Sequence, residues 1–269
     1  MKLYERFRVK PGSEVDLSKH DPDECGGLGS KDKALGRLEK DHSRLADLQE
    51  LLYAEGRRAL LVVLQAMDTG GKDGTIRHVM SAVSPQSCRV TAFKAPTPEE
   101  LAHDFLWRVH PAVPRRGEIG VFNRSHYEDV LVVRVHELAA REVWSRRYDQ
   151  INQFEALLRQ NGVHILKFFL HISRQEQLDR LRARLDDPRK QWKISPDDFR
   201  ERPYWNQYMK AYADALARCS TPQAPWFVIP ANHKWFRNAA ISRIIIETLE
   251  SLDMKYPKPK FDLSKIVVE

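Results

Sequence analysis

The stretch LLVVLQAMDTGGKDGTI, residues 60–76, constrains the fold of this chain more than any other. It begins inside an unbroken apolar run at 59–64. This run is rich in Leu and Val and is too short for a typical helix. Such a run predicts a strand buried on both faces, as found inside a parallel sheet. A turn containing Gly70 and Gly71 follows, and Lys72 then precedes a predicted helix. The order of strand, glycine turn, lysine and helix is typical of a phosphate-binding loop.

In such a loop the glycines let backbone N–H groups approach phosphate oxygens, and Lys72 supplies a mobile cation that we expect to face solvent. The chain departs from the pattern G-x-x-x-x-G-K-[ST] at Ala66, which replaces a glycine, and at Asp73, which replaces a metal-binding hydroxyl. An ordinary glycine turn followed by a lysine is therefore the alternative interpretation. Asp68 favours the phosphate site, because a carboxylate there would repel phosphate unless a cation lay between them. We expect Asp68 to be a metal ligand, directly or through water.

The composition is that of a soluble globular protein, and 269 residues are enough for one α/β domain with a substantial core. Lys and Arg exceed Asp and Glu by 44 to 37, which favours a polyanionic partner: nucleic acid, a phosphate chain or a membrane surface. The three cysteines are far apart and odd in number, which favours a reducing compartment. No apolar leader or membrane-spanning stretch is evident, so we expect a cytoplasmic protein.

Short apolar strands alternate with helical segments along the chain, which predicts a three-layer, doubly wound α/β fold with a five-stranded, mostly parallel sheet. Residues 1–31 are expected to form an arm that lies on a single domain at 32–269. Besides the strand at 59–64, we expect strands at 89–93, 117–122, 163–170 and 226–229. Helices are expected at 32–55, 73–83, 97–107, 141–160, 204–218 and 234–252, with a helical lid at about 174–200.

A second polar segment, residues 123–129, follows the strand predicted at 117–122. Ligands of open parallel sheets bind beyond the carboxyl ends of the strands, so this segment and the glycine turn should converge there. Asn123, Glu128 and Asp129 are further candidate metal ligands. The alternative for the two acids is a solvated helix start, where acidic residues are common.

Between Arg174 and Lys193 there are seven Lys or Arg residues and four Asp or Glu residues. A solvated helix face is one interpretation of this run. The other is a mobile arginine lid, which nucleotide kinases carry after the corresponding strand. Arg180 and Arg184 are four residues apart and share a helix face, whereas Arg182 points elsewhere.

Four segments together resemble the polyphosphate kinase 2 family: QAMDTGGKDGTI, FKAPTPEEL, GEIGVFNRSHYEDVLVVRVH and DDPRKQWKISPDD. The resemblance runs from about Gly27 to near the C-terminus, and the asparagine in FNRSHYED is similar to the class that acts on both AMP and ADP. It implies a P-loop kinase fold. It also implies an enzyme that transfers the terminal phosphoryl group of inorganic polyphosphate to AMP or ADP, giving ADP or ATP reversibly, with Mg²⁺. We further expect a homo-oligomer, either a dimer or a tetramer.

The resemblance also assigns roles to residues of this sequence. The implied catalytic residues are Asp68, Lys72, Arg124, Arg180 and Arg184. The implied phosphate- and nucleotide-binding residues are Thr69, Gly70, Gly71, Asp73, Gly74, Thr75, Lys94, Asn123, Glu128, Arg134 and Lys193. Many family members have aspartate where this chain has Asn123, and a neutral amide holds a metal less tightly than a carboxylate. Asp68, Glu128 or Asp129 would then carry more of the metal binding.

Two other functions fit the same residues. One is an ATP-dependent nucleoside-monophosphate kinase, which differs in its phosphoryl donor. The other is a P-loop protein that binds a polyanion without catalysis. The sequence has no nucleic-acid-binding module and no interleaving of aromatic and basic residues, so we expect neither nucleic acid nor membrane as a partner.

Overall fold

The computed structural model describes residues 2–28, 30–263 and 266. Its centre is one sheet with five parallel strands in the order β2-β3-β1-β4-β5. The strands are β1 (Ala59–Gln65), β2 (Cys88–Ala92), β3 (Ile119–Asn123), β4 (Val163–His171) and β5 (Trp226–Pro230). All of β1 is buried because it is the middle strand and both its faces are covered. The predicted five-stranded α/β architecture is confirmed, and the sheet is parallel throughout.

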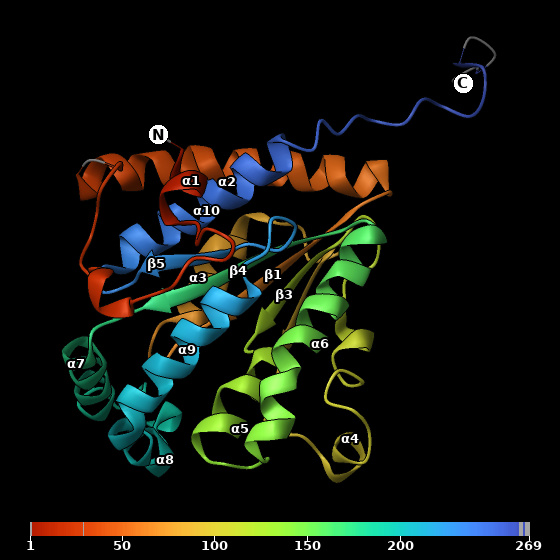
Figure 1. The fold of residues 1–269 in the computed structure, drawn as a ribbon. Helices are drawn as coiled ribbons and strands as arrows, with labels where there is room; N and C mark the ends of the chain where they lie inside the picture. Colours follow the sequence, from red (N-terminus) through yellow and green to blue (C-terminus); the bar gives the residue numbers. More distant parts are fainter. Residues whose placement is uncertain (1, 29, 264–265, 267–269) are drawn as a thin grey trace.

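Helices lie on both faces of the sheet (Figure 1). The chain runs from β1 to β2 in one direction across the sheet and from β3 through β4 to β5 in the other. Right-handed crossovers then place the connecting helices on opposite faces. The first layer contains α1 (Leu3–Phe7), α2 (Lys31–Glu55), α3 (Lys72–Val79) and α10 (Lys234–Glu250), and the second contains α6 (Arg141–Gln160) and α9 (Trp205–Cys219).

The remaining helices lie beyond the carboxyl ends of the strands or in connections (Figure 1). They are the α-helices α4 (Pro98–Leu101), α5 (Val132–Val135), α7 (Arg174–Leu185) and α8 (Pro196–Arg200), and the 3-10 helices η1 (Leu17–Lys19), η2 (Met80–Ala82), η3 (His110–Ala112), η4 (His126–Val130), η5 (Gln191–Lys193) and η6 (Arg202–Tyr204).

The helix expected at 97–107 is the clearest error of the sequence analysis. A capping box at Thr97 and Glu100 does start a helix, but α4 ends after one turn at Leu101. The side chain of Asp104 accepts a hydrogen bond from the backbone N–H of Leu106 at 3.0 Å. Such local bonds from aspartate offer the backbone an alternative to the helix, and the chain continues in turns.

The N-terminal segment packs on the edge of the domain beside β5. Leu3, Phe7 and Val9 are buried in the core. The N–H of Val9 donates to the carbonyl of Trp226 at 2.8 Å, and Arg8 forms an antiparallel bridge with Phe227. The segment expected as an arm therefore contributes apolar side chains to the same core as the rest of the chain.

Among residues 2–28, 30–263 and 266, no helix is both long enough and apolar enough to cross a bilayer.

Candidate active site at the phosphate loop

The glycine turn between β1 and α3 is tight because two of its residues lack a side chain. A Cβ on Gly70 would lie 2.5 Å from the Cβ of Ala66, so these two positions cannot both carry more bulk. This close approach accounts for a small residue at position 66, where the usual pattern has glycine. Gly71 has φ of +104°, and Thr69 has φ of +62°. A positive φ is unfavourable for any residue that carries a side chain, so Thr69 is held in a strained conformation.

The two polar segments converge as predicted. β1 and β3 pair in parallel with Leu64 opposite Asn123, so both loops leave the same edge of the sheet. Nδ2 of Asn123 donates to Oδ1 of Asp73 at 2.8 Å. Nη2 of Arg124 donates to Oδ1 of Asp68 at 3.0 Å. Arg124 holds this position with φ of +60°, a second strained residue at this site.

Lys72 lies at the centre of this charge cluster. Its Nζ donates to the carbonyl oxygen of Ala66 at 3.0 Å, and the side chain is partly buried, whereas solvent exposure was expected. Burial and the positive charge of Arg124 lower the pKa of Lys72, while the carboxylates of Asp68 and Glu128 oppose that shift. Burial likewise raises the pKa of Glu128, against the charges of Arg124 and Lys72. The four groups therefore form one electrostatically coupled cluster.

Helix α7 contacts the phosphate loop directly. Arg180, on α7, donates from Nη1 to the carbonyl of Thr69 at 3.0 Å and from Nη2 to the carbonyl of Ala231 at 2.6 Å. Gln177 donates to the carbonyl of Asp68 at 3.2 Å. Nε of Arg180 also pairs with Glu176 at 2.6 Å. Arg180 thus joins α7 to the loop and to the chain after β5, while keeping a cation at the loop.

Comparison with known proteins agrees with this geometry. The family model described as Polyphosphate kinase 2 (PPK2) matches residues 29–257. This chain belongs to the polyphosphate kinase 2 family. The resemblance drawn from the sequence motifs is confirmed.

Relatives of similar length support the assignment. The AMP/ADP-polyphosphate phosphotransferase of Meiothermus ruber is 53% identical over 265 residues, covering 98% of this chain and 99% of that protein. The ADP-polyphosphate phosphotransferase of Rhodopseudomonas palustris is 46% identical, covering 94% of this chain and 92% of that protein. The crystal structure of Polyphosphate Kinase 2 from Arthrobacter aurescens TC1 superposes with a TM-score of 0.95 at 46% identity, covering 98% of this chain and 94% of that one.

Buried polar side-chain atoms without partners mark this polyphosphate kinase 2 loop as a place for a ligand. Among the described residues, Oγ1 of Thr69, Oγ1 of Thr75 and Oε1 of Gln65 are buried and make no hydrogen bond. Leaving such groups unpaired is costly unless a ligand or water completes them. All three flank or belong to the phosphate loop, where phosphate oxygens and a hydrated cation could supply partners.

The donor set fits Mg²⁺ bound together with substrate. In the part of the chain that the structure describes, no group of three or more His, Cys, Asp or Glu side chains is arranged to hold a metal. Mg²⁺ in kinases is usually held by one or two carboxylates plus substrate phosphates and water, so a dedicated protein cage is not required. The Asp68 side chain is 25% exposed and lies beside the phosphate loop, as such a ligand would.

Arg237 belongs to this site, and the sequence analysis missed it. It lies on α10 and is 2% exposed. A Cβ on Gly71 would clash with its Nη1 atom, and one on Gly74 would lie 3.1 Å from its Nη2 atom, so the guanidinium lies against the loop backbone. Burial, together with the charge of Arg180, lowers the pKa of Arg237 to about 10. No local pattern in the sequence marks it, because α10 also carries Lys234, Asn238 and Arg243 among its apolar residues.

Other predicted residues lie at the edges of the site or outside it. Lys94 and Lys193 are exposed, and Nζ of Lys193 lies 4.9 Å from the ring centroid of Trp192. Nη1 of Arg184 is 3.7 Å from the carboxylate of Asp198, on the lid itself.

Asp129 and Arg134 each have a partner away from the phosphate loop. Oδ1 of Asp129 accepts from Nη1 of Arg147 at 2.8 Å, and burial raises the pKa of Asp129 to about 6. Arg134 is bonded to Asp214 at 2.6 Å, in a pocket that no phosphate-loop residue lines. The structure thus gathers Asp68, Lys72, Arg124, Glu128 and Arg180 and leaves these two on neighbouring surfaces.

Proposed function

We propose that this chain is a polyphosphate-dependent nucleotide kinase, which transfers the terminal phosphoryl group of inorganic polyphosphate to AMP and to ADP in a reversible reaction. The observation that carries the proposal is the meeting of Lys72, Arg124 and Asp68 where the loops after β1 and β3 converge. The names of the M. ruber and R. palustris relatives supply the donor and the acceptors.

The chemistry requires positioning and charge neutralisation more than covalent help. An oxygen of the acceptor phosphate attacks the terminal phosphorus of the donor, and the bond from that phosphorus to the bridging oxygen breaks in line. Backbone N–H groups of the loop hold the donor end, with the N-terminus of α3 directed at it. Lys72 and Arg124 offset the charge that develops on the transferred group and on the leaving chain.

Magnesium is the cofactor we propose for this step. Asp68 is the first candidate ligand, and Glu128, Asn123 and Asp129 are the further ones. When bound, Mg²⁺ neutralises phosphate charge and orients the two substrates. The Arg124 guanidinium already holds Asp68 in place at 3.0 Å, so the carboxylate is oriented before substrate arrives.

The experiment that tests this function is product analysis with polyphosphate as the only phosphoryl donor and AMP, ADP or GDP as acceptor. We expect ADP from AMP and ATP from ADP, with formation dependent on Mg²⁺. Lys72→Ala serves as the inactive control. No phosphorylated product from any acceptor would refute the proposal.

The same assay separates the two alternatives. An ATP-dependent nucleoside-monophosphate kinase would phosphorylate AMP with ATP and not with polyphosphate. A polyanion-binding protein without catalysis would retain polyphosphate or DNA and yield no new nucleotide with either donor. No observation on the site favours either alternative over the polyphosphate-dependent reaction.

We further propose that the enzyme works in the cytoplasm, as a homo-oligomer, without a nucleic-acid or membrane partner. The three free cysteines, Cys25, Cys88 and Cys219, are compatible with a reducing compartment. The excess of seven positive charges suits a phosphate-chain substrate. Light scattering at two protein concentrations would test the oligomeric state.

A further inference from the structure

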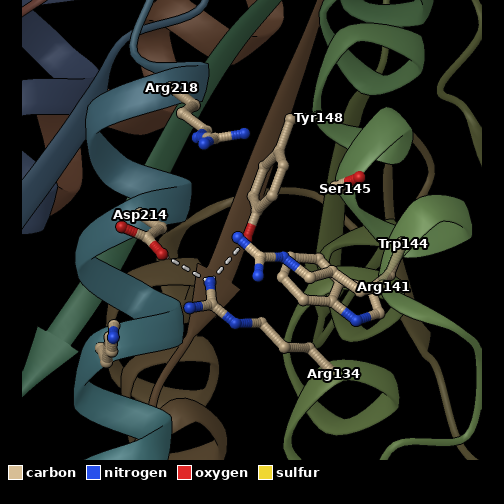
Figure 2. A pocket seen from close by; sticks show the side chains of 8 residues that line it. Arg134, Arg141, Trp144, Ser145, Tyr148, Asp214 and Arg218 are labelled. Carbon is tan, nitrogen blue, oxygen red and sulfur yellow. Dashed lines mark hydrogen bonds and ion pairs between the residues drawn. The ribbon is translucent and has the colours of Figure 1, made fainter.

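A second cationic pocket lies between α5, α6 and α9, away from the phosphate loop. Its volume is about 360 Å³, within the usual range for small-ligand sites. Figure 2 shows the guanidinium of Arg134 reaching from α5 toward α9, with Trp144 and Tyr148 of α6 beside it. The lining residues are Arg134, Arg141, Trp144, Ser145, Tyr148, Lys210, Asp214 and Arg218.

The positive charge of this pocket is not balanced within it. Asp214 is the single carboxylate among the lining residues, and it is already bonded to Arg134 at 2.6 Å. Arg141, Lys210 and Arg218 have no carboxylate partner among the described residues. Three cations from two helices therefore face one concave surface and repel one another. Such an arrangement is stabilised by an anion with several charges.

The two aromatic rings fix guanidinium groups in place. The guanidinium carbon of Arg134 lies 4.7 Å from the centroid of the Trp144 ring, and that of Arg218 lies 4.9 Å from the centroid of the Tyr148 ring. Nη1 of Arg134 also donates to the hydroxyl of Tyr148 at 3.0 Å. Because each ring already has a guanidinium over it, neither ring is free on that face to stack on a base.

We propose that this pocket binds a linear chain of phosphates, as a second anion site distinct from the phosphate loop. A nucleoside would need acceptors as well as donors for its base edge, and besides the unpaired cations and the groups already bonded to one another the lining offers the hydroxyl of Ser145. A phosphate chain needs cations at several points along its length, which Arg141, Lys210 and Arg218 provide. The pocket binds inorganic polyphosphate or the phosphate tail of a nucleotide through the same cations.

The test is calorimetric titration of the full chain with tripolyphosphate, without acceptor nucleotide. We expect two binding sites per chain in the wild type and one in Lys210→Ala/Arg218→Ala, whose affinity at the pocket should fall at least tenfold. The single change Lys210→Glu should also lower the affinity of the pocket for tripolyphosphate. Because Lys210 is exposed, this variant should fold normally and can be used if the double variant folds poorly. Arg146→Ala, exposed on the same helix α6 but outside the pocket, is the matched control and should retain both sites.

Two further titrations identify the source of the phosphate chain. If ATP binds the wild-type pocket and loses that binding in Lys210→Glu, the pocket takes nucleotide tails as well as polyphosphate. If only tripolyphosphate does so, the inorganic chain is the ligand. Either result supports the proposal. Equal tripolyphosphate stoichiometry in wild type and both variants, or a loss of AMP binding as large as that of tripolyphosphate, would overturn it.

The outcome is independent of the phosphoryl-transfer proposal. Lys72→Ala should lose turnover and keep the pocket, whereas Lys210→Glu should lose the pocket site and keep turnover of AMP at saturating polyphosphate. Failure of the pocket proposal would leave the transfer reaction intact. If the transfer proposal failed, calorimetric titration of the wild type would still show two tripolyphosphate sites per chain.

Discussion

Two buried cations of this protein differ in whether the protein itself supplies a negatively charged partner. Lys167, on β4, is fully buried, and its Nζ bonds to the carboxylate of Glu155, to the hydroxyl of Tyr127 at 2.9 Å and to the carbonyl of Cys219 at 2.7 Å. Arg237, on α10, is almost as deeply buried, but within the part of the chain that the structure describes its guanidinium donates only to the side-chain amide oxygen of Asn238, at 2.9 and 3.1 Å. It has no carboxylate partner among the described residues.

The difference indicates which buried cation is neutralised by a carboxylate of the protein and which one is left for a ligand to neutralise. Burial would raise the pKa of Glu155, but Lys167 and His126 hold it below its ordinary value, so the core contains a satisfied ion pair. At Arg237, by contrast, burial and the nearby charge of Arg180 lower the pKa. An unpaired buried charge is costly, and we propose that a phosphate chain bound at the glycine turn beside Gly71 offsets it. The following variants test this distinction.

The largest effect is expected in the core. Lys167→Met leaves Glu155 buried without its cation and should lower the free energy of unfolding by about 3–5 kcal/mol. Urea denaturation measures this loss. Adding Glu155→Gln should recover part of it, because no charge is then left unpaired. Polyphosphate affinity of the folded variant should be unchanged, and a loss of stability under about 1 kcal/mol would contradict the comparison.

Next is Lys72, which is partly buried yet belongs to the site. Lys72→Ala should lower kcat about a hundredfold or more, since a cation at developing phosphoryl charge is typically worth about 3 kcal/mol. Loss of its hydrogen bond to Ala66 should cost about 1 kcal/mol of stability. Steady-state kinetics and urea denaturation give the two numbers. Arg77→Ala, exposed on the same helix, is the control, and near-normal turnover of a well-folded Lys72→Ala protein would refute the role.

Arg237 should show the reverse of the Lys167 result. Arg237→Met keeps most of the side-chain volume and removes the unpaired charge, so stability should stay constant or rise. The apparent affinity for polyphosphate should fall about tenfold, equivalent to roughly 1.4 kcal/mol. Arg243, on the same helix, is paired with Asp41 and Glu247, so Arg243→Met should cost stability and leave that affinity unchanged. A marked loss of stability in Arg237→Met would make it a structural residue like Lys167.

Sequence alone predicted the architecture and the loop, because a buried central strand and a glycine turn are local patterns. The convergence of the loops after β1 and β3 followed from the parallel sheet. Arg237 could not be predicted, because it lies 166 positions after Gly71 in the sequence. The two residues become neighbours only when α10 packs on α3. The partners of Arg180 and Arg184 were equally out of reach, since helical spacing places them on one face but gives neither neighbour.

The lid arginines now have different expected effects, although helical spacing predicted them as a pair. Arg180 contacts the carbonyls of Thr69 and Ala231, so Arg180→Ala should lower kcat about tenfold, more than it raises the nucleotide KM. Arg184, held by Asp198 within the lid, should show about a threefold loss, and the exposed Arg182 none. Steady-state kinetics of the three alanine variants test this order. Equal, small effects at all three would favour a solvated helix face.

The smallest effect concerns acceptor choice at Glu128. AMP and ADP differ by one phosphate, and a partly buried carboxylate coupled to Lys72 and Arg124 repels the longer acceptor more than the shorter one. Glu128→Asn should therefore cut AMP phosphorylation more than ADP phosphorylation and lower the AMP-to-ADP ratio of kcat/KM about threefold. Polyphosphate affinity should change little. Glu142→Asn, at an exposed position on α6 with no role assigned to it, is the control and should leave the ratio unchanged.

The pH dependence of that ratio gives an independent check, because burial raises the pKa of Glu128. As pH falls through this raised pKa, Glu128 takes up a proton and becomes neutral, as in the asparagine variant. The wild-type AMP-to-ADP ratio should then fall toward the value of Glu128→Asn at low pH and be fully developed above the pKa. The variant should show no such change. A wild-type ratio that stays constant with pH and equals that of the variant would mean that Glu128 is only a helix-start acid, and that acceptor choice is determined by the lid.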